Sequence, residues 1–407
     1  MEPGGLAPWK TRLAPGLKLD AKAAAPFAAA PMISPCVPVL VHPSLFPEAV
    51  HARLRASFQT RRIHGAFHYD TARRARRWMA VHAAHAPAPT AGGAVSLYDR
   101  AVAEAVACLE SRPWTCVGLG CGSGHKEARV LAALAARRLA SVDIPVDVSV
   151  PLVLVSRETA LGRVPGSLVQ GLVADLADAD DLDAALAPLH PPGEGRCVTL
   201  FGMFPNFEPG FLFERLARWL RPGDRLIFSA NLAPGPDVTA GTAEVLPQYD
   251  NAETRTWLAT LLEDHGVAPG SGEVEFRIES DPDVAGCARI VADWVVAQPS
   301  ELVLDRETFV LEPGARLRLF YSYRHTPASM EAGARRHGLR LDASWIAASG
   351  QEGVFLAKRD PATCAESGRL SEPSSLRAAG DDGHRTKDCR QAPSPRRSAS
   401  SDERSCL

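Results

Sequence analysis

Apolar and polar positions alternate along the middle of the chain in two rhythms, one typical of strands and one typical of helices. Residues 114–118 (WTCVG) form a short apolar run, and residues 126–139 then carry apolar side chains at helical spacing. Further strand-like runs separated by helix-compatible sequence lie at residues 144–149, 168–176, 197–204 and 225–232. Strands that alternate with crossover helices favour a parallel, doubly wound sheet, so the pattern predicts an α/β fold.

The rhythm changes after residue 232. A long helix-like piece covers residues 242–265, and strand-like pieces lie near residues 274–279 and 288–296. We therefore predict a lobe inserted into the α/β fold over residues 233–305.

Regular patterning then resumes. Residues 316–323 (RLRLFYSY) alternate like a strand, residues 328–337 are helical, and residues 353–358 form a last strand. These elements are expected to complete a Rossmann-like sheet of seven strands, with an antiparallel hairpin at its edge.

The two ends of the chain have a different composition. Residues 1–44 are rich in Ala and Pro, and the fixed φ of proline disfavours regular structure, so an extended arm is expected there. Residues 361–407 contain almost no bulky apolar side chains and cannot offset their ordering entropy, so this tail is predicted to be disordered. Its Arg/Ser repeats leave RNA binding or phosphorylation open as an alternative to a solvated extension.

Charge and cysteine usage limit the partners and the compartment. A formal net charge of -2 gives no field that would attract nucleic acid or an anionic membrane to the folded part. The 9 cysteines are odd in number and irregularly spaced, which is typical of reduced thiols. The chain has neither an apolar run long enough to span a bilayer nor the pattern of an export signal. We expect a soluble, cytoplasmic protein.

The sequence GLGCGSGHKE, residues 118–127, stands between a predicted strand and a predicted helix. Glycines there allow a sharp turn and a close approach to a ligand, and the free N–H groups of the helix start favour negative charge. A dinucleotide loop has the spacing G-x-G-x-x-G, whereas Gly118, Gly120 and Gly122 give G-x-G-x-G. This spacing favours a methyltransferase loop over a dinucleotide loop.

Two aspartates follow at the ends of the next two strands. Asp147 (PVDVS) lies where a carboxylate accepts both ribose hydroxyls of a nucleoside, and Asp175 (VADL) lies where it accepts from an adenine amino group. Each alone could equally cap a helix or a turn, but their joint placement favours a nucleoside site.

Asn206, in the sequence FGMFPNF after the fourth strand, lies at the predicted carboxyl edge of the sheet, where open α/β sheets bind ligands. An amide can accept from an amine and donate to a carboxylate, so it could orient a nucleophile. The alternative is an ordinary Pro-Asn turn.

Together with these motifs, FHYD (residues 67–70), LRPGDRLIFSANL (220–232), QYDNAETRTWL (248–258) and SYRHTP (322–327) resemble the histidine-specific methyltransferase family of ergothioneine biosynthesis, in order over residues 45–358. The resemblance implies the methyltransferase fold and S-adenosylmethionine as cofactor. It implies that the cofactor is surrounded by Gly118, Gly120, Lys126, Asp147 and Asp175. It further implies that Tyr69, Asn206 and Tyr249 meet the amine and the carboxylate of an amino acid, with Tyr249 at the carboxylate.

One departure from the family concerns the substrate. The resemblance implies that members acting on histidine carry a Glu two residues before the serine matching Ser322, where this chain has Phe320. A phenyl ring cannot accept an imidazole N–H, and a site that has lost such a hydrogen bond discriminates against the substrate that needs it. The small Ala292 also stands where the family has a bulkier residue. Histidine is therefore not the expected substrate.

The sequence thus predicts an S-adenosylmethionine-dependent N-methyltransferase acting on a small-molecule amine, an amino acid or a derivative. We expect a monomer with no metal, no nucleic-acid partner and no membrane association. The alternatives are an NAD-dependent oxidoreductase and a catalytically silent binding module. The expected division is an arm (1–44), a substrate-side segment (45–95), a methyltransferase core (96–232), the inserted substrate lobe (233–305), the completion of the sheet (306–360) and the tail (361–407).

Overall fold

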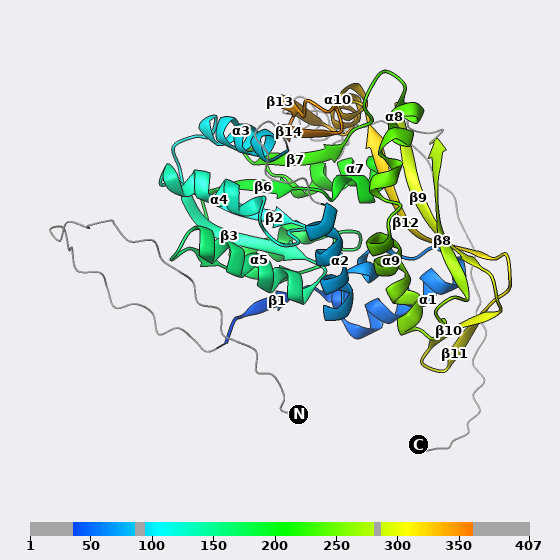
Figure 1. Cartoon of the computed structure of the whole chain (residues 1–407). Coiled ribbons are helices and arrows are strands. Elements are labelled where there is room, and N and C mark those ends of the chain that lie inside the picture. Colours follow the sequence, from blue (N-terminus) through cyan, green and yellow to red (C-terminus); the bar gives the residue numbers. More distant parts are fainter. Residues whose placement is uncertain (1–35, 86–93, 281–285, 361–407) are drawn as a thin grey trace, which may run out of the picture. The chain divides into compact units, whose positions relative to one another are not determined.

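A mixed β-sheet with helices on both faces forms the centre of the molecule (Figure 1). The computed structural model describes residues 36–85, 94–280 and 286–360. Most of the expected N-terminal arm and the whole tail lie outside these residues. Residues 39–41 of the arm form a short strand, β1, that pairs in parallel with β5 at one edge of the sheet.

The central sheet has nine strands in the order β1-β5-β3-β2-β6-β7-β14-β13, with β4 paired to β3. Its strands are β1 (Val39–Val41), β2 (Trp114–Leu119), β3 (Ala140–Asp147), β4 (Leu168–Val169), β5 (Gly171–Val173), β6 (Gly195–Leu200), β7 (Arg225–Asn231), β13 (Leu339–Ile346) and β14 (Glu352–Arg359). The pairs from β1 to β7 are parallel, while β14 runs antiparallel to both β7 and β13. The α/β fold with an antiparallel hairpin follows the sequence prediction, but the sheet has more strands than the seven expected.

A second, antiparallel sheet is formed by β8 (Gly272–Ser280), β9 (Cys287–Val296) and β12 (Arg316–His325), beside a hairpin of β10 (Ser300–Leu304) and β11 (Glu307–Leu311). The prediction that residues 316–323 join the central sheet was wrong, because β12 pairs with β9 instead. The place at the sheet edge is taken by β13, a strand that the sequence reading missed. Alternation shows that one face of a strand is buried, but it does not specify which strand is the partner.

Three large hydrophobic clusters hold these layers together, and a fourth, small one contains Cys121, Val153 and Val173. Val117 and Leu119 of β2 join the cluster on one face of the central sheet, whereas Trp114 and Cys116 join the cluster on the other face, as the period of a strand requires. The third cluster lies between the second sheet, α1 and α9. The helices are α1 (Pro47–Thr60), α2 (Ala72–His85), α3 (Ala94–Ala107), α4 (Glu127–Ala136), α5 (Val150–Arg163), α6 (Leu182–Leu186), α7 (Pro209–Trp219), α8 (Val238–Val245), α9 (Ala252–Asp264) and α10 (Pro327–Arg336).

The long helix expected over residues 242–265 is divided into α8 and α9. Pro247 lies in the connection, and the Asn251 side chain accepts a hydrogen bond from the Thr254 N–H at 2.9 Å, which caps a new helix. The break leaves Tyr249 between the two helices, outside regular helical structure. Among the described helices, none combines the length and the apolar character needed to cross a membrane.

Candidate functional site

The loop that follows β2 needs glycine at two of its predicted positions. Gly120 and Gly122 have φ of 63° and 52°, in the left-handed region that residues with a β-carbon rarely adopt. A β-carbon at Gly120 would lie 2.3 Å from Met203 Cγ, and one at Gly122 would lie 2.8 Å from the Trp78 ring. The loop is therefore shaped by glycine, and Met203 and Trp78 lie directly against it.

Asp147 ends β3 and is tied to this loop. Its Oδ2 accepts the Gly122 N–H at 3.0 Å, and its Oδ1 accepts the Ser149 N–H at 3.0 Å. Burial raises the pKa of Asp147 to about 6, against the lowering effect of these backbone hydrogen bonds. Each carboxylate oxygen keeps a second lone pair, and the buried Ser149 Oγ has no hydrogen-bond partner among the described residues. These acceptors fit the paired hydroxyls of a ribose.

Asp175 lies at the tip of the neighbouring strand. The sheet register pairs Asp147 with Val173 of β5, so the two carboxylates emerge at the same edge of the sheet. Asp175 Oδ1 accepts the Ala177 N–H at 3.0 Å, while its Oδ2 is buried and has no hydrogen bond among the described residues. The residue is only 3% exposed. A buried acceptor without a donor is costly, and an adenine amino group would supply the donor.

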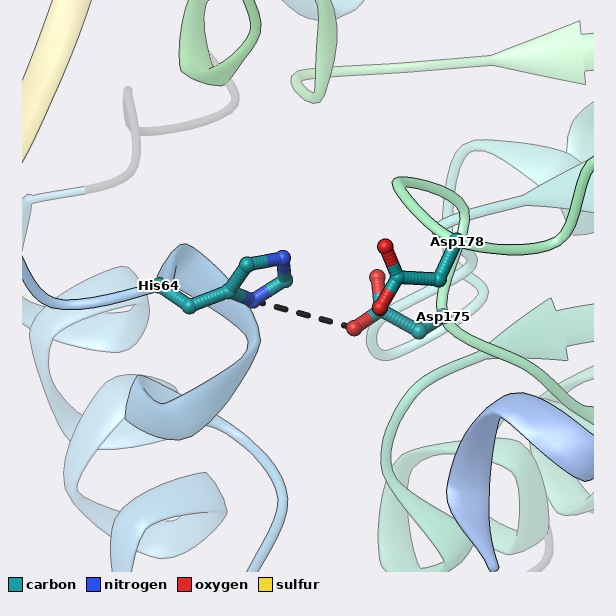
Figure 2. A group of neighbouring side chains, drawn as sticks. All are labelled: His64, Asp175 and Asp178. Carbon is teal, nitrogen blue, oxygen red and sulfur yellow. Dashed lines mark ion pairs between the residues drawn. The ribbon is translucent and has the colours of Figure 1, made fainter. Parts of the chain in front are cut away.

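Figure 2 shows that Asp175 faces His64 and Asp178, and the ligand atoms of these three residues lie within 4.8 Å of one another. In the described part of the chain this is the one grouping with the spacing of a metal site. Arg53, however, donates to Asp178 Oδ2 at 2.7 Å and places its Nε 3.5 Å from Asp175 Oδ2. His64 Nδ1 already accepts the Ala66 N–H at 3.3 Å. The guanidinium therefore supplies positive charge to both carboxylates, and the arrangement is an ion-pair cluster.

Lys126 follows the glycine loop at the start of α4 and links it to the opposite end of the chain. Its Nζ donates to the Tyr98 hydroxyl at 2.8 Å and lies 3.6 Å from Glu352 Oε1 on β14. It also lies 4.3 Å from the centroid of the Tyr98 ring. Its neighbour His125 is exposed, whereas Cys116 and Cys121 are buried, and among the described residues these three do not form a group with the spacing of a metal site.

A continuous series of aromatic rings runs from the glycine loop to the second sheet. Tyr69 lies 5.8 Å from Trp78 and 5.4 Å from Trp257, measured between ring centroids. Phe320 of β12 continues the series, 6.0 Å from Trp257 and 6.3 Å from Tyr249. Sequence reasoning did not place Trp257 at the site, although its motif was part of the family resemblance. The aromatic wall consists of Tyr69, Trp78, Tyr249, Trp257 and Phe320, and it brings together three stretches of the sequence: residues 69–78, residues 249–257 and β12.

Tyr69 joins this wall to the carboxylate at the end of β3. Desolvation raises the pKa of Tyr69 above its usual range, and the nearby negative charge of Asp147 raises it further. The hydroxyl is therefore protonated at neutral pH, and Tyr69 can donate a hydrogen bond or pack as a ring.

The Tyr249 hydroxyl is the centre of a polar hub. Asn231 Nδ2 donates to it at 3.0 Å and an Arg324 guanidinium nitrogen donates to it at 2.9 Å, while Ser322 Oγ lies 2.9 Å away. Two donors occupy both lone pairs of the tyrosine oxygen, so its proton points to Ser322. Sequence reasoning missed Asn231 and Arg324. Asn231 could have been found, because it ends a predicted strand at the same sheet edge as Asn206.

The remaining predicted residues lie around this hub. Asn206 ends the short helix η4 (Phe204–Asn206) after β6, where its N–H donates to the Met203 carbonyl at 3.0 Å, and β12 packs against η4. Ala292 of β9 is fully buried and stands opposite Phe320 in the register of the second sheet. The structure thus brings Asn206, Tyr249, Ser322 and Phe320 to the carboxyl edge of the central sheet, where β12 reaches it through a bridge between His325 and Leu232.

Comparison with known proteins gives one family. A family model described as "Histidine-specific methyltransferase, SAM-dependent" matches residues 95–359. No curated protein matches the chain.

Solved structures of methyltransferases are similar at low identity. The CcbJ methyltransferase from Streptomyces caelestis is 16% identical, over 69% of this chain and 96% of that one, with a TM-score of 0.34. Magnesium protoporphyrin IX methyltransferase from Synechocystis PCC 6803, solved with bound SAH, is 12% identical over 72% of this chain and 97% of that one, with a TM-score of 0.36. The mitomycin 7-O-methyltransferase MmcR is 14% identical over 78% and 69% of the two chains, with a TM-score of 0.39.

Proposed function

The chain belongs to the family of histidine-specific, S-adenosylmethionine-dependent methyltransferases, and we propose that it methylates the amine nitrogen of an amino acid, or of an amino-acid derivative, other than histidine. The part of the proposal that concerns the substrate rests on the position of Phe320. Its ring lies between Trp257 and Tyr249, at the position where the resemblance implies a glutamate in members that act on histidine. An apolar ring there favours a larger, more apolar side chain than imidazole.

When bound, the cofactor would supply an electrophilic methyl group on its sulfonium: the N–C bond to the amine would form as the C–S bond breaks, which gives S-adenosylhomocysteine, the methylated amine and a proton. We assign the residues that hold it to the glycine loop and the two strand tips: Gly118, Gly120, Gly122, Lys126, Asp147 and Asp175. Asp147 accepts the ribose hydroxyls, and Asp175 accepts from the adenine amino group through Oδ2, which pairs with Arg53 at 3.5 Å but accepts no hydrogen bond among the described residues. The glycines let the backbone approach the rest of the nucleoside.

On the acceptor side, the amide of Asn206 orients the amine so that its lone pair is directed at the methyl carbon. Such an in-line displacement depends on positioning more than on a strong acid or base. Tyr69 and Tyr249 close the site from two sides, and Phe320, Ser322 and Ala292 line the binding position of the acceptor. Water is kept away from the reacting atoms by the aromatic wall.

We extend the proposal to the organisation of the protein. Residues 233–305 form the substrate lobe inserted into the methyltransferase core, and the second sheet presents that lobe to the site. The partner is a small-molecule amine, with no metal, nucleic acid or membrane, and the protein acts as a monomer in the cytoplasm. The near-neutral net charge of -2 supports the lack of a polyanionic partner.

Mass spectrometry tests the proposal directly. Purified protein is incubated with S-adenosylmethionine carrying a deuterated methyl group and with a panel of amino acids that includes histidine and tryptophan. We expect deuterated methyl groups on the α-amine of an aromatic or bulky apolar amino acid and little transfer to histidine. Preferred transfer to histidine would reject the reading of Phe320.

A thermal-shift measurement separates the alternatives. A ligand that binds only the native state raises the melting temperature, so S-adenosylhomocysteine should raise it and NAD should not. A rise with S-adenosylhomocysteine, but no transfer to any amine in the panel, would favour a catalytically silent binding module.

A further inference from the structure

Arg324 is a buried guanidinium without an acidic partner. It lies near the end of β12 and is 4% exposed. One terminal nitrogen donates to the carbonyls of Leu232 and Gln351, both at 3.2 Å, and the other donates to the Tyr249 hydroxyl at 2.9 Å. Its Nε has no hydrogen bond, and none of the described Asp or Glu residues forms an ion pair with it. A desolvated charge is normally compensated by an opposite charge, so this one calls for an anion.

The groups around Arg324 do not supply that anion. Asn231 and Ser322 are neutral, and the Tyr249 hydroxyl accepts from Arg324. His325 is buried, and first desolvation and then the charge of Arg324 lower its pKa to about 3, so it is neutral as well. The hub around Tyr249 therefore carries one net positive charge.

The hydrogen bonds within the hub leave one hydroxyl able to donate to a ligand. Because Asn231 and Arg324 both donate to the Tyr249 oxygen, the tyrosine proton is directed to Ser322 Oγ, 2.9 Å away. Ser322 then accepts from Tyr249 and keeps its own hydroxyl proton for another acceptor. A positive charge next to a donor matches a carboxylate and repels an ammonium group.

We propose that Arg324 is a specificity-determining residue that makes the enzyme require an anionic group on its acceptor, so that it methylates zwitterionic amino acids and rejects the corresponding decarboxylated amines. The inference rests on the proposed function. Arg324 acts on the carboxylate through its charge and through the Tyr249 and Ser322 hydroxyls. The same charge raises the energy of a cationic acceptor that has no carboxylate.

The test compares matched substrate pairs: tryptophan with tryptamine, tyrosine with tyramine, phenylalanine with phenethylamine, and histidine with histamine. For each pair, the ratio of kcat/KM for the acid to that for the amine is measured with radiolabelled S-adenosylmethionine. We expect the native protein to favour the acid, and Arg324→Met to lower the ratio by about 10- to 100-fold, since a charge-assisted hydrogen bond is lost. Arg324→Lys, which keeps the charge, should recover part of the ratio.

Arg340→Met is the matched control, because Arg340 is exposed on β13 and pairs only with Asp342 among the described residues. Its ratio should equal that of the native protein. S-adenosylhomocysteine binding is measured for every variant as a check on folding, and the Lys variant carries the test if the Met variant does not fold.

Equal use of acid and amine by the native protein, or an equal loss for both in Arg324→Met, would overturn the inference. Failure of the proposed function has a different signature. In that case no member of any pair is methylated, although S-adenosylhomocysteine still binds.

Discussion

A buried arginine lies near each end of the strands of the central sheet, and the two arginines have different partners. Arg196, at the amino end of β6, is 1% exposed and is neutralised by two carboxylates: it donates to Asp224 at 2.8 Å and to Asp183 at 2.5 Å. Arg324, at the carboxyl edge, is bound by two backbone carbonyls and a tyrosine hydroxyl. The charge of Arg196 is therefore compensated within the fold, whereas the charge of Arg324 has no acidic partner among the described residues.

The same contrast appears in the carboxylates. Asp224, at the amino ends of the strands, accepts hydrogen bonds from Arg196 and from the Arg221 N–H. Asp175, at the carboxyl ends, has an ion pair with Arg53 at 3.5 Å, but its buried Oδ2 accepts no hydrogen bond among the described residues. A network completed by its own chain stabilises the fold, and one left incomplete is available to a ligand. The difference favours the carboxyl ends of the strands as the position of the candidate site.

The largest effect is expected for the buried arginine at the amino ends of the strands. Arg196→Met leaves Asp224 buried without its cation, which should lower the free energy of unfolding by about 3–5 kcal/mol. Arg324→Met should cost clearly less, because it strands no carboxylate. Urea denaturation measures both, with Arg218→Met on the exposed surface of α7 as a control. Equal losses for the two buried arginines would break the comparison.

The next largest effect is expected for Asp147, whose carboxylate joins the glycine loop to the end of β3. Asp147→Ala removes the acceptor of the Gly122 and Ser149 N–H groups together with the ribose acceptor, so S-adenosylhomocysteine affinity should fall at least about 100-fold. Calorimetric titration measures it. Asp99→Ala, on an exposed side chain of α3, should bind like the native protein. Unchanged affinity in Asp147→Ala would mean that the nucleoside binds elsewhere.

A smaller change separates the acceptor half of the site from the cofactor half. Tyr249→Phe removes one oxygen and leaves Asn231, Arg324 and Ser322 without their common partner. We expect kcat/KM for the acceptor to fall about tenfold, consistent with loss of a hydrogen bond to a charged group. Cofactor affinity should stay the same in a parallel titration. A loss confined to the cofactor would contradict the assignment of the hub.

The mildest test uses pH. The pKa of Asp147 is raised to about 6 in the folded, ligand-free protein, so this protein binds the proton more tightly than the unfolded chain does. Its free energy of unfolding therefore increases as pH falls below 6 and decreases as pH rises through 6. Binding has the opposite sign, because only the carboxylate accepts from both hydroxyls and the backbone. S-adenosylhomocysteine affinity should therefore decrease below pH 6, by at most about tenfold per pH unit.

Asp147→Asn separates this titration from those of the ionisable groups that lie close to Asp147, namely Tyr69, Cys121 and Glu127. The weakening below pH 6 should disappear in this variant. A native profile that is flat between pH 5 and 8 would assign the raised pKa no role in binding.

The sequence predicted the position in the fold of those parts of the candidate site that are local. The glycine loop and the two aspartates each follow a strand within a few residues, and parallel strands place their carboxyl ends together, so strand order alone brings Asp147 beside Asp175. The family resemblance added Tyr249 and Ser322.

The hub and the second sheet were out of reach of pattern reasoning. Arg324 lies against Tyr249 because β12 pairs with β9 in the second sheet and not with a strand of the central sheet. The alternation of apolar and polar residues in RLRLFYSY is compatible with either sheet. The apolar spacing of the helix that contains Trp257 is the same whether this side chain packs in a core or lines a site. Long-range pairing of this kind depends on tertiary packing, which a single strand or helix pattern does not encode.

The position of β14 has a consequence for the synthesis of the protein. This last described strand lies between β7 and β13. Gln351, directly before it, accepts a hydrogen bond from Arg324, and its first residue, Glu352, pairs with Lys126. Among the described strands, the ribosome therefore makes last the one that contributes to both halves of the candidate site. Until then β7 has an open edge, so a prematurely terminated chain would be an inert, aggregation-prone fragment and not a slower enzyme.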